Sequence, residues 1–204
     1  MKIIAVGMNY AAHNREMSNP QPDAEPVIFL KPDSALLTGG RPFFIPDFTQ
    51  ELHYETEIVL RICRLGKHID ERFAHRYYDA LTVGIDFTAR DLQKKYRAAG
   101  LPWDLSKGFD GSAVVGKFIS VEEVGDVQNI DFHLDIDGIT VQKGNTSDML
   151  FGFDKIISFV SRYFTLKTGD LIYTGTPAGV GTVKIGNNLK GFVGDRKLLD
   201  FNIK

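Results

Sequence analysis

Apolar and polar positions along the chain follow a pattern that favours strands over helices. Short apolar and β-branched runs predict strands over residues 2–6, 27–31, 43–45, 57–62, 81–85 and 171–173. Alternation around Asp137-Gly138 predicts a β-hairpin over 130–142, and residues 188–204 predict two final strands joined at Gly194-Asp195. Helical composition or apolar periodicity predicts helices over residues 9–17, 72–79, 86–97 and 147–164. We therefore expect a sheet-rich α+β protein.

Composition limits the classes of partner. The 204 residues are 43% hydrophobic, enough for the core of one domain, and 24 Lys plus Arg balance 26 Asp plus Glu. A net charge of −2 gives no general attraction to nucleic acid or to an anionic membrane, so we expect a small-molecule partner. The sequence shows neither a signal peptide nor a long apolar run, and the single cysteine, Cys63, is expected to be a buried structural thiol. These features predict a soluble cytoplasmic protein.

Two carboxylates, Glu55 and Glu57, occupy alternate positions among strand-forming residues. Alternate strand residues share a face, so both side chains, with that of His53, should lie on one face, about 7 Å apart along the chain. Carboxylates this close repel unless solvent, a shared proton, basic groups or a divalent cation compensates them. A solvated strand face is the commoner outcome, and the pair alone leaves these alternatives open.

A third acid, Asp86, follows the apolar run 81–85 and would begin the helix predicted over 86–97. One interpretation is that it caps the helix, with Thr88 and Asp91 forming a capping box.

In the other interpretation Asp86, Arg90 and Gln93 share one helical face, which presents an acid, a cation and an amide at the end of a strand. A helical crossover would bring this face to the two glutamates. Two Glu and one Asp without thiolates suit Mg²⁺, Mn²⁺ or Ca²⁺, with His53 as the competing ligand by spacing.

Two further segments are candidates for chemistry. His13 and Glu16 lie three positions apart beside the proline-rich loop 18–26, which is predicted to be mobile, and their spacing alone favours an exposed ion pair. The glycine-rich segment 174–181 lacks the Gly-Lys-Ser/Thr ending of a nucleotide P-loop. Its glycines would instead let backbone amides and the Thr176 hydroxyl approach a carboxylate or oxyanion.

Six stretches together resemble one known family. They are Gly7-Met-Asn-Tyr-Ala-Ala-His13, Pro26-Val-Ile-Phe-Leu-Lys-Pro32, Tyr54-Glu-Thr-Glu57, Asp86-Phe-Thr-Ala-Arg-Asp-Leu-Gln93, Gly100-Leu-Pro-Trp-Asp-Leu-Ser-Lys-Gly-Phe-Asp110 and Thr174-Gly-Thr-Pro-Ala-Gly-Val-Gly181. In this order they are similar to the fumarylacetoacetate hydrolase family, in particular its compact members that act on acylpyruvates and oxaloacetate. The resemblance implies one catalytic domain over 1–204 with a mixed, rolled β-structure, a mobile lid within 1–25, and a homodimer.

The resemblance also implies an activity, namely metal-dependent hydrolysis of the C–C bond of a 2,4-dioxo acid of the acylpyruvate or fumarylpyruvate type, which gives pyruvate and a carboxylic acid. Mg²⁺ or Mn²⁺, with Ca²⁺ possible in crystals, would bind Glu55, Glu57 and Asp86. The implied catalytic residues are a His13–Glu16 general-base dyad and Lys107, which meets the developing negative charge, and the implied substrate-binding residues are Arg90, Gln93 and Thr176.

The same enolate would serve an alternative activity, either oxaloacetate decarboxylation, keto–enol tautomerisation or isomerisation of a 2-oxo diacid. A further alternative is a binding module in which the acids hold a structural Ca²⁺. Met8 occupies a position that is often basic in relatives, which favours a neutral distal group on the substrate.

Overall fold

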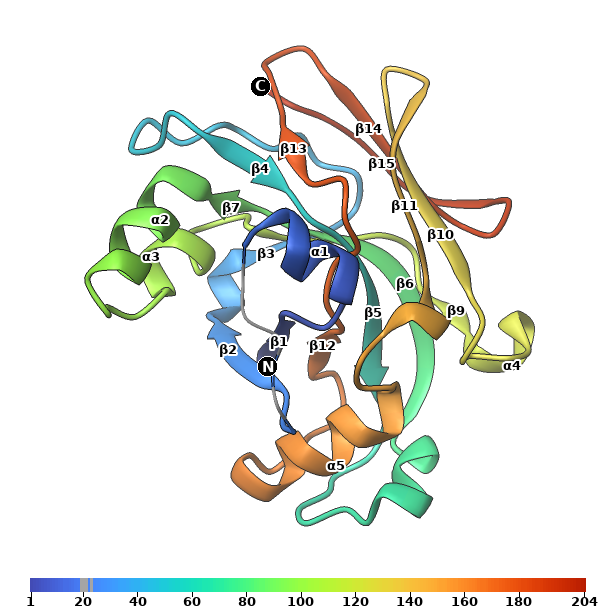
Figure 1. Ribbon diagram of the computed structural model, residues 1–204. Coiled ribbons are helices and arrows are strands. Elements are labelled where there is room, and N and C mark those ends of the chain that lie inside the picture. The colour runs from blue at the N-terminus through green and yellow to red at the C-terminus, as the bar shows by residue number, and fades with distance from the viewer. Residues whose placement is uncertain (19–21, 23) are drawn as a thin grey trace.

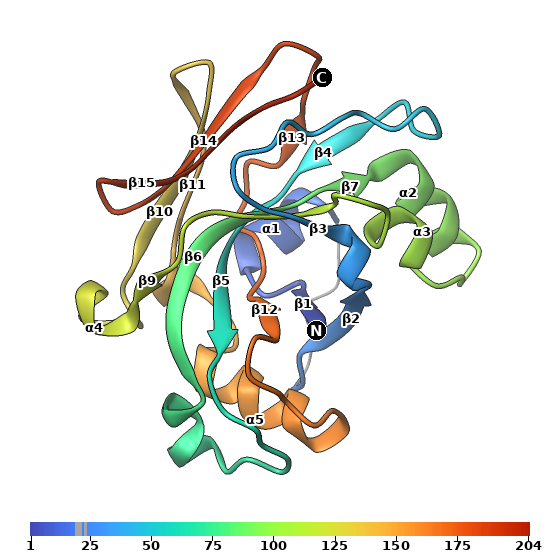
Figure 2. The ribbon, with the colours of Figure 1, turned by 180° about the vertical axis from the view of Figure 1, so that it is seen from behind.

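Within residues 1–18, 22 and 24–204, which the computed structural model describes, the chain forms a curled eight-stranded sheet and two smaller sheets (Figures 1 and 2). In the eight-stranded sheet, called the large sheet below, the order is β2-β1-β12-β5-β6-β8-β3, and β9 pairs with β6. Its strands are β1 (Ile3–Gly7), β2 (Val27–Lys31), β3 (Leu36–Leu37), β5 (Thr56–Ile62), β6 (Tyr78–Asp86), β8 (Ala113–Val115), β9 (Ile119–Ser120) and β12 (Leu171–Tyr173). Because β1–β12 and β3–β8 are parallel and the other pairs antiparallel, the sheet is mixed, as predicted.

Two smaller sheets and five short helices complete the described fold. The four-stranded sheet contains β10 (Asp131–Ile136), β11 (Ile139–Asn145), β14 (Asn188–Val193) and β15 (Arg196–Asn202), and the three-stranded sheet contains β4 (Leu52–Tyr54), β7 (Thr88–Ala89) and β13 (Gly181–Thr182). The helices are α1 (Ala11–Glu16), α2 (Arg90–Ala98), α3 (Asp104–Lys107), α4 (Val121–Val124) and α5 (Phe153–Tyr163). Figures 1 and 2 show α2 and α3 side by side at one edge and α5 at the end of the molecule away from β13.

The antiparallel pair β5–β6 is the centre of the fold and carries the acidic residues. On β5, Ile58 and Leu60 belong to the main hydrophobic core, whereas Val59, on the opposite face, packs with Tyr173 in a second core. Alternate side chains of this strand are therefore buried on both faces. Glu57 shares the face of Val59, so its carboxylate is held inside the protein.

Several sequence-based element predictions are confirmed. The hairpin, the two final strands, and the strands at 27–31 and 171–173 all form. The segment 43–45 is not a strand, because Phe43 makes only an isolated bridge to Ile203. The helix predicted over 72–79 is a 3-10 turn, Glu71–Arg76, and the helix predicted over 147–164 is confined to α5 after a 3-10 turn at Thr146–Asp148.

The region around Asp86 differs from the prediction. Asp86 is the last residue of β6, and α2 begins only at Arg90. The predicted capping box is wrong, since Asp91 instead accepts hydrogen bonds from the Thr49 hydroxyl and the Gln50 amide. The predicted crossover is wrong too, because β5 and β6 are neighbouring antiparallel strands.

Three further expectations concern the burial of Cys63, the mobile lid and membrane-spanning segments. Cys63 is only partly buried, and its thiol lies 3.7 Å from the Arg76 carbonyl oxygen. The lid predicted within residues 1–25 includes residues 19–21 and 23, which lie outside the described residues. In the described part of the chain no helix is both long enough and apolar enough to span a membrane.

Candidate active site

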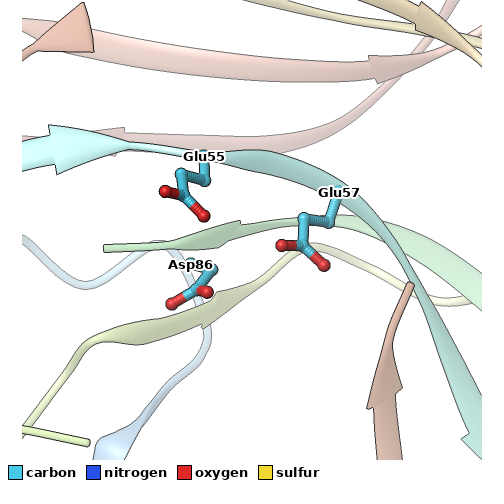
Figure 3. A group of neighbouring side chains, drawn as sticks. All are labelled: Glu55, Glu57 and Asp86. Atoms are coloured by element: carbon cyan, nitrogen blue, oxygen red, sulfur yellow. The ribbon is translucent and has the colours of Figure 1, made fainter. Parts of the chain in front are cut away.

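Three buried carboxylates converge at the junction of β4, β5 and β6. Glu55 lies between β4 and β5, Glu57 on β5 and Asp86 at the end of β6, and the Asp86 amide donates to the Glu55 carbonyl oxygen over 2.8 Å. Figure 3 shows Glu57 extending from β5 and Glu55 from the backbone just before this strand, both towards Asp86. One oxygen from each carboxylate lies within 4.8 Å of the others, and each residue is at most 5% exposed.

This donor set fits one hard divalent cation. Opposed ligands at typical Mg²⁺–O or Ca²⁺–O distances are separated by about 4 to 5 Å, the spacing that these oxygens span. The competing ligand by spacing, His53, lies outside this group: its Nε2 is 3.1 Å from Glu51 Oε1, and its Nδ1 accepts from Arg90 Nε over 3.3 Å.

Three buried cations surround the carboxylates. Lys107 Nζ donates to Glu55 Oε2 over 2.8 Å, to Asp86 Oδ2 over 2.7 Å and to Thr88 Oγ1 over 2.7 Å. Arg90 binds Glu55 Oε1 and the Gln93 side-chain oxygen, and Lys31 forms an ion pair with Asp86 Oδ1. Arg90 and Gln93 thus reach the site from α2, as the sequence predicted, although Asp86 is not on that helix.

The surroundings shift the pKa values of the site in opposite directions. Burial raises the pKa of the Glu57 carboxyl well above its usual range, and repulsion from Asp86 and Glu55 adds to this effect. For Glu55, burial is outweighed by the attraction of Lys107 and Arg90, so its pKa is lowered. Burial lowers the pKa of Lys31 despite the nearby Asp86, whereas for Lys107 the attraction of Asp86 and Glu55 outweighs burial and raises the pKa.

Formal charges in this cluster balance when all groups are ionised. The three acids contribute −3 and Lys31, Lys107 and Arg90 contribute +3, all at most 5% exposed. A bound divalent cation would therefore leave a net charge of +2 in a buried region. Uncompensated buried charge is costly, so such a site favours a ligand carrying two negative charges.

The glycine-rich segment supplies a backbone donor to this cluster. Gly175 has φ +101°, and a Cβ at this position would lie 2.7 Å from Asn9 Cβ, so both conformation and space require glycine. Its amide donates to Glu57 Oε2 over 2.7 Å. The Thr176 hydroxyl donates to the Thr56 carbonyl oxygen and accepts from Gln142, and Thr176 lines the cavity beside the carboxylates.

His13 approaches the cavity from α1. Its Nδ1 lies 3.1 Å from Glu16 Oε2, and Glu16 Oε1 also accepts from the Gly179 amide over 3.0 Å. Asn9 anchors this segment, because its side chain donates to the carbonyl oxygens of Phe151 and Thr174. At 6% exposure His13 belongs to a buried wall, which differs from the exposed pair that its spacing favours.

The cavity bounded by these side chains measures about 30 Å³. It is lined by Val6, Gly7, Met8, His13, Phe29, Glu55, Glu57, Asp86, Arg90, Gln93, Arg97, Trp103, Lys107 and Thr176. One water needs roughly 10–15 Å³, so a ligand larger than two or three waters can enter only when part of the wall moves. Eight of the nine site residues expected from the sequence line this cavity; the ninth, Glu16, contacts His13.

Sequence reasoning gave no role to three residues of this region. Lys31 lies in the stretch Pro26–Pro32 that resembles the family, but nothing in the sequence around it indicates that Asp86 becomes its buried partner. Asn9 is similar, since its hydrogen bonds go to residues distant in the chain. Arg97 could have been found from helical spacing, because it follows Arg90 and Gln93 on the same face of α2.

Comparison with known proteins identifies the family. The family model described as Fumarylacetoacetate (FAA) hydrolase C-terminal matches residues 2–204. A mitochondrial oxaloacetate decarboxylase of Dictyostelium discoideum is 41% identical over 204 residues, covering 99% of this chain and 93% of the relative. A mitochondrial oxaloacetate tautomerase of Arabidopsis thaliana is 41% identical over 203 residues, covering 100% and 91%.

A solved structure agrees with these relatives. Fumarylpyruvate hydrolase from Pseudomonas aeruginosa, crystallised with Mn²⁺ and pyruvate, superposes with a TM-score of 0.93 at 34% identity, covering 100% of this chain and 89% of that one. The chain therefore belongs to the fumarylacetoacetate hydrolase family, a family of enzymes, and has its curled, sheet-rich α+β fold. Both the family and the fold expected from the sequence are confirmed.

One expectation from the sequence is wrong. The curated relatives are named as mitochondrial proteins, which contradicts the expected cytoplasmic location. Net charge, hydropathy and cysteine content describe solubility and redox chemistry, and these properties do not distinguish one compartment from another.

Proposed function

We propose that this protein acts on oxaloacetate through enolate intermediates, interconverting the keto and enol forms and releasing CO₂ from the bound keto form. The observation that most supports this proposal is the charge-balanced cluster of three acids and three cations, whose net charge becomes +2 when a divalent cation binds. Oxaloacetate is a dianion and restores neutrality, whereas an acylpyruvate with one carboxylate leaves an unbalanced charge. The names of the relatives, oxaloacetate decarboxylase and oxaloacetate tautomerase, support the same substrate.

Glu55, Glu57 and Asp86 are the residues that would hold Mg²⁺ or Mn²⁺. When bound, the ion supplies Lewis-acid polarisation of the carboxylate and 2-oxo group of the substrate. Arg90, Gln93 and Thr176 line the same cavity and would orient the substrate through hydrogen bonds.

Lys107 is the group that stabilises the enolate. Lys107 is 2% exposed, and the attraction of its ammonium to Asp86 and Glu55 raises its pKa, so it remains charged while negative charge develops on the substrate oxygen at C2. The Lys107 side chain also lies 5.2 Å from the centre of the Phe29 ring, which excludes water from one side.

His13 moves the proton. Glu16 at Nδ1 leaves Nε2 of the imidazole for the substrate, and Nε2 takes a proton from C3 as the C–H electron pair moves into the C2–C3 bond. Transfer of that proton to the oxygen at C2 gives the enol, and in the reverse direction the proton leaves this oxygen and returns to C3. In decarboxylation the C3–C4 bond of the keto form breaks instead, C4 leaves as CO₂, and the electron pair of that bond forms the enolate of pyruvate without any base. Protonation of this enolate at C3 gives pyruvate.

Purified protein with Mg²⁺ or Mn²⁺ tests the proposal. Enol and keto oxaloacetate are followed by ultraviolet absorbance, pyruvate by a coupled reductase, and acetylpyruvate cleavage is measured alongside. We expect oxaloacetate to be processed with a higher kcat/KM than acetylpyruvate. A protein that cleaves acetylpyruvate and leaves both oxaloacetate reactions at their uncatalysed rates contradicts the proposal.

Hydrolysis of a 2,4-dioxo acid is the second candidate. The buried His13–Glu16 pair favours it, because the same imidazole could remove a proton from water attacking C4. The fumarylpyruvate hydrolase of Pseudomonas aeruginosa is a relative with that name. The expected homodimer stays a prediction alongside either activity.

A further inference from the structure

Among the residues that the structure describes, Arg97 is the cavity-lining cation whose charge no neighbouring side chain compensates. Arg90 and Lys107 also line the cavity, but their donors bind Glu55, Gln93, Asp86 and other groups. By contrast, the Arg97 side chain forms no hydrogen bond or ion pair with any residue of the described ranges, and it is exposed.

Helix geometry places Arg97 in line with the substrate-orienting residues. Residues seven positions apart on a helix are separated by almost two turns, about 10 Å along the axis, and lie on nearly the same face. Arg90 and Gln93 are buried against the carboxylates, and Arg97 follows at the exposed end of the same row. From Gln93 to Arg97 the helix rises about 6 Å, a separation comparable with the length of an extended four-carbon diacid itself.

We propose that Arg97 binds the distal carboxylate of a dicarboxylic 2-oxo acid and thereby selects diacids over monoacids. A guanidinium suits this role because its planar donors bind a carboxylate in a bidentate manner. Met8, which also lines the cavity, has no charge to offer a distal carboxylate, and by itself it favours a neutral distal group; the missing positive charge is therefore assigned to Arg97. The inference deepens the proposed function and rests on it for the identity of the diacid.

A matched pair of non-reacting ligands isolates the distal carboxylate. Malate and lactate share a 2-hydroxy carboxylate and differ in that only malate carries a second carboxylate. Their dissociation constants are measured by calorimetry on the Mg²⁺-loaded protein for wild type, Arg97→Met and Arg97→Lys. Lys95→Met is the control, since Lys95 is exposed on the same helix and does not line the cavity.

We expect wild type to bind malate more tightly than lactate, and Arg97→Met to weaken malate roughly tenfold, the low end for a charge-assisted hydrogen bond, without changing lactate. Arg97→Lys should restore part of the difference, and Lys95→Met should match wild type. If Arg97 serves only as a cation at the helix C-terminus, its loss lowers Tm and leaves malate binding intact, which overturns the inference. Equal binding of malate and lactate by wild type overturns it as well.

Oxaloacetate turnover, measured on the same samples, separates the two claims. If wild type turns over oxaloacetate but Arg97→Met binds malate as tightly as wild type does, the role of Arg97 is refuted and the proposed function stands. Arg97-dependent malate binding without any oxaloacetate turnover supports that role and refutes the proposed function.

Discussion

Replacing Lys31 by Met removes a buried charge on which the acidic cluster depends. The Lys31 ammonium pairs with Asp86 Oδ1 and donates to the Lys107 carbonyl oxygen and to both oxygens of Ser112. Lys31 is 3% exposed and Asp86 0%, so water cannot replace these contacts.

The remaining contacts set the magnitude. Breaking a buried ion pair typically costs about 3–5 kcal/mol. Asp86 keeps Lys107 at its other oxygen, and the Lys107 carbonyl keeps the Ser112 hydroxyl as a donor, so the lower end, about 3 kcal/mol, applies. For a chain of this size each kcal/mol shifts Tm by roughly 2–4 °C, which gives a fall of about 6–12 °C.

Thermal unfolding followed by circular dichroism measures this fall, with and without Mg²⁺. The control is Lys197→Met, which removes one partner of an exposed ion pair with Asp200 and should cost less than about 1 kcal/mol. Mg²⁺ should reduce the deficit of Lys31→Met, because the ion compensates Asp86. If Lys31→Met melts no lower than Lys197→Met, the lysine is not a charged partner of Asp86, and the balance of three acids and three cations is wrong.

Two other predictions concern the base and the metal. His13→Gln should slow oxaloacetate tautomerisation by about 10²- to 10⁴-fold and decarboxylation much less, because only tautomerisation removes a proton from C3; equal losses in the two assays would refute this assignment. The raised pKa of Glu57 means that the folded protein favours the protonated carboxyl, so without metal the stability contributed by Glu57 is lost as pH rises through that pKa. Mg²⁺ binds the deprotonated carboxylate and therefore competes with the proton. The rise in Tm caused by Mg²⁺ should therefore grow with pH in wild type and not in Glu57→Gln, as thermal melts over a pH series would show; a rise independent of pH would count against metal binding at Glu57.

Local patterns predicted the parts of the site that depend on local geometry. Alternation along a strand placed Glu55 and Glu57 on one face, and helical spacing placed Arg90 and Gln93 together; both placements agree with the structure. Asp86 was misplaced at a helix start because residues 87–89 have no composition that separates an extended segment from a first helical turn. In the folded chain, pairing of Thr88 with His53 keeps that segment extended and delays the helix to Arg90.

Long-range pairing explains what the sequence did not predict. Lysine at the end of an apolar run is typical of a solvated strand end, yet Lys31 is buried because Asp86, Ser112 and the Lys107 carbonyl surround it. The spacing of His13 and Glu16 likewise predicted an exposed pair, whereas the anchoring of Asn9 to Phe151 and Thr174 holds this segment against the cavity.

Hydrogen–deuterium exchange of pyruvate tests most directly the central claim, that this site stabilises the enolate of a bound 2-oxo acid. Nuclear magnetic resonance in D₂O follows loss of the pyruvate methyl protons in the presence of protein and Mg²⁺. We expect wild type to accelerate exchange, and Lys107→Met and Glu57→Gln to lose most of that acceleration, because one removes the cation beside the enolate oxygen and the other a metal ligand. Exchange that proceeds no faster than with Mg²⁺ alone, or that is the same in all three proteins, would contradict the account.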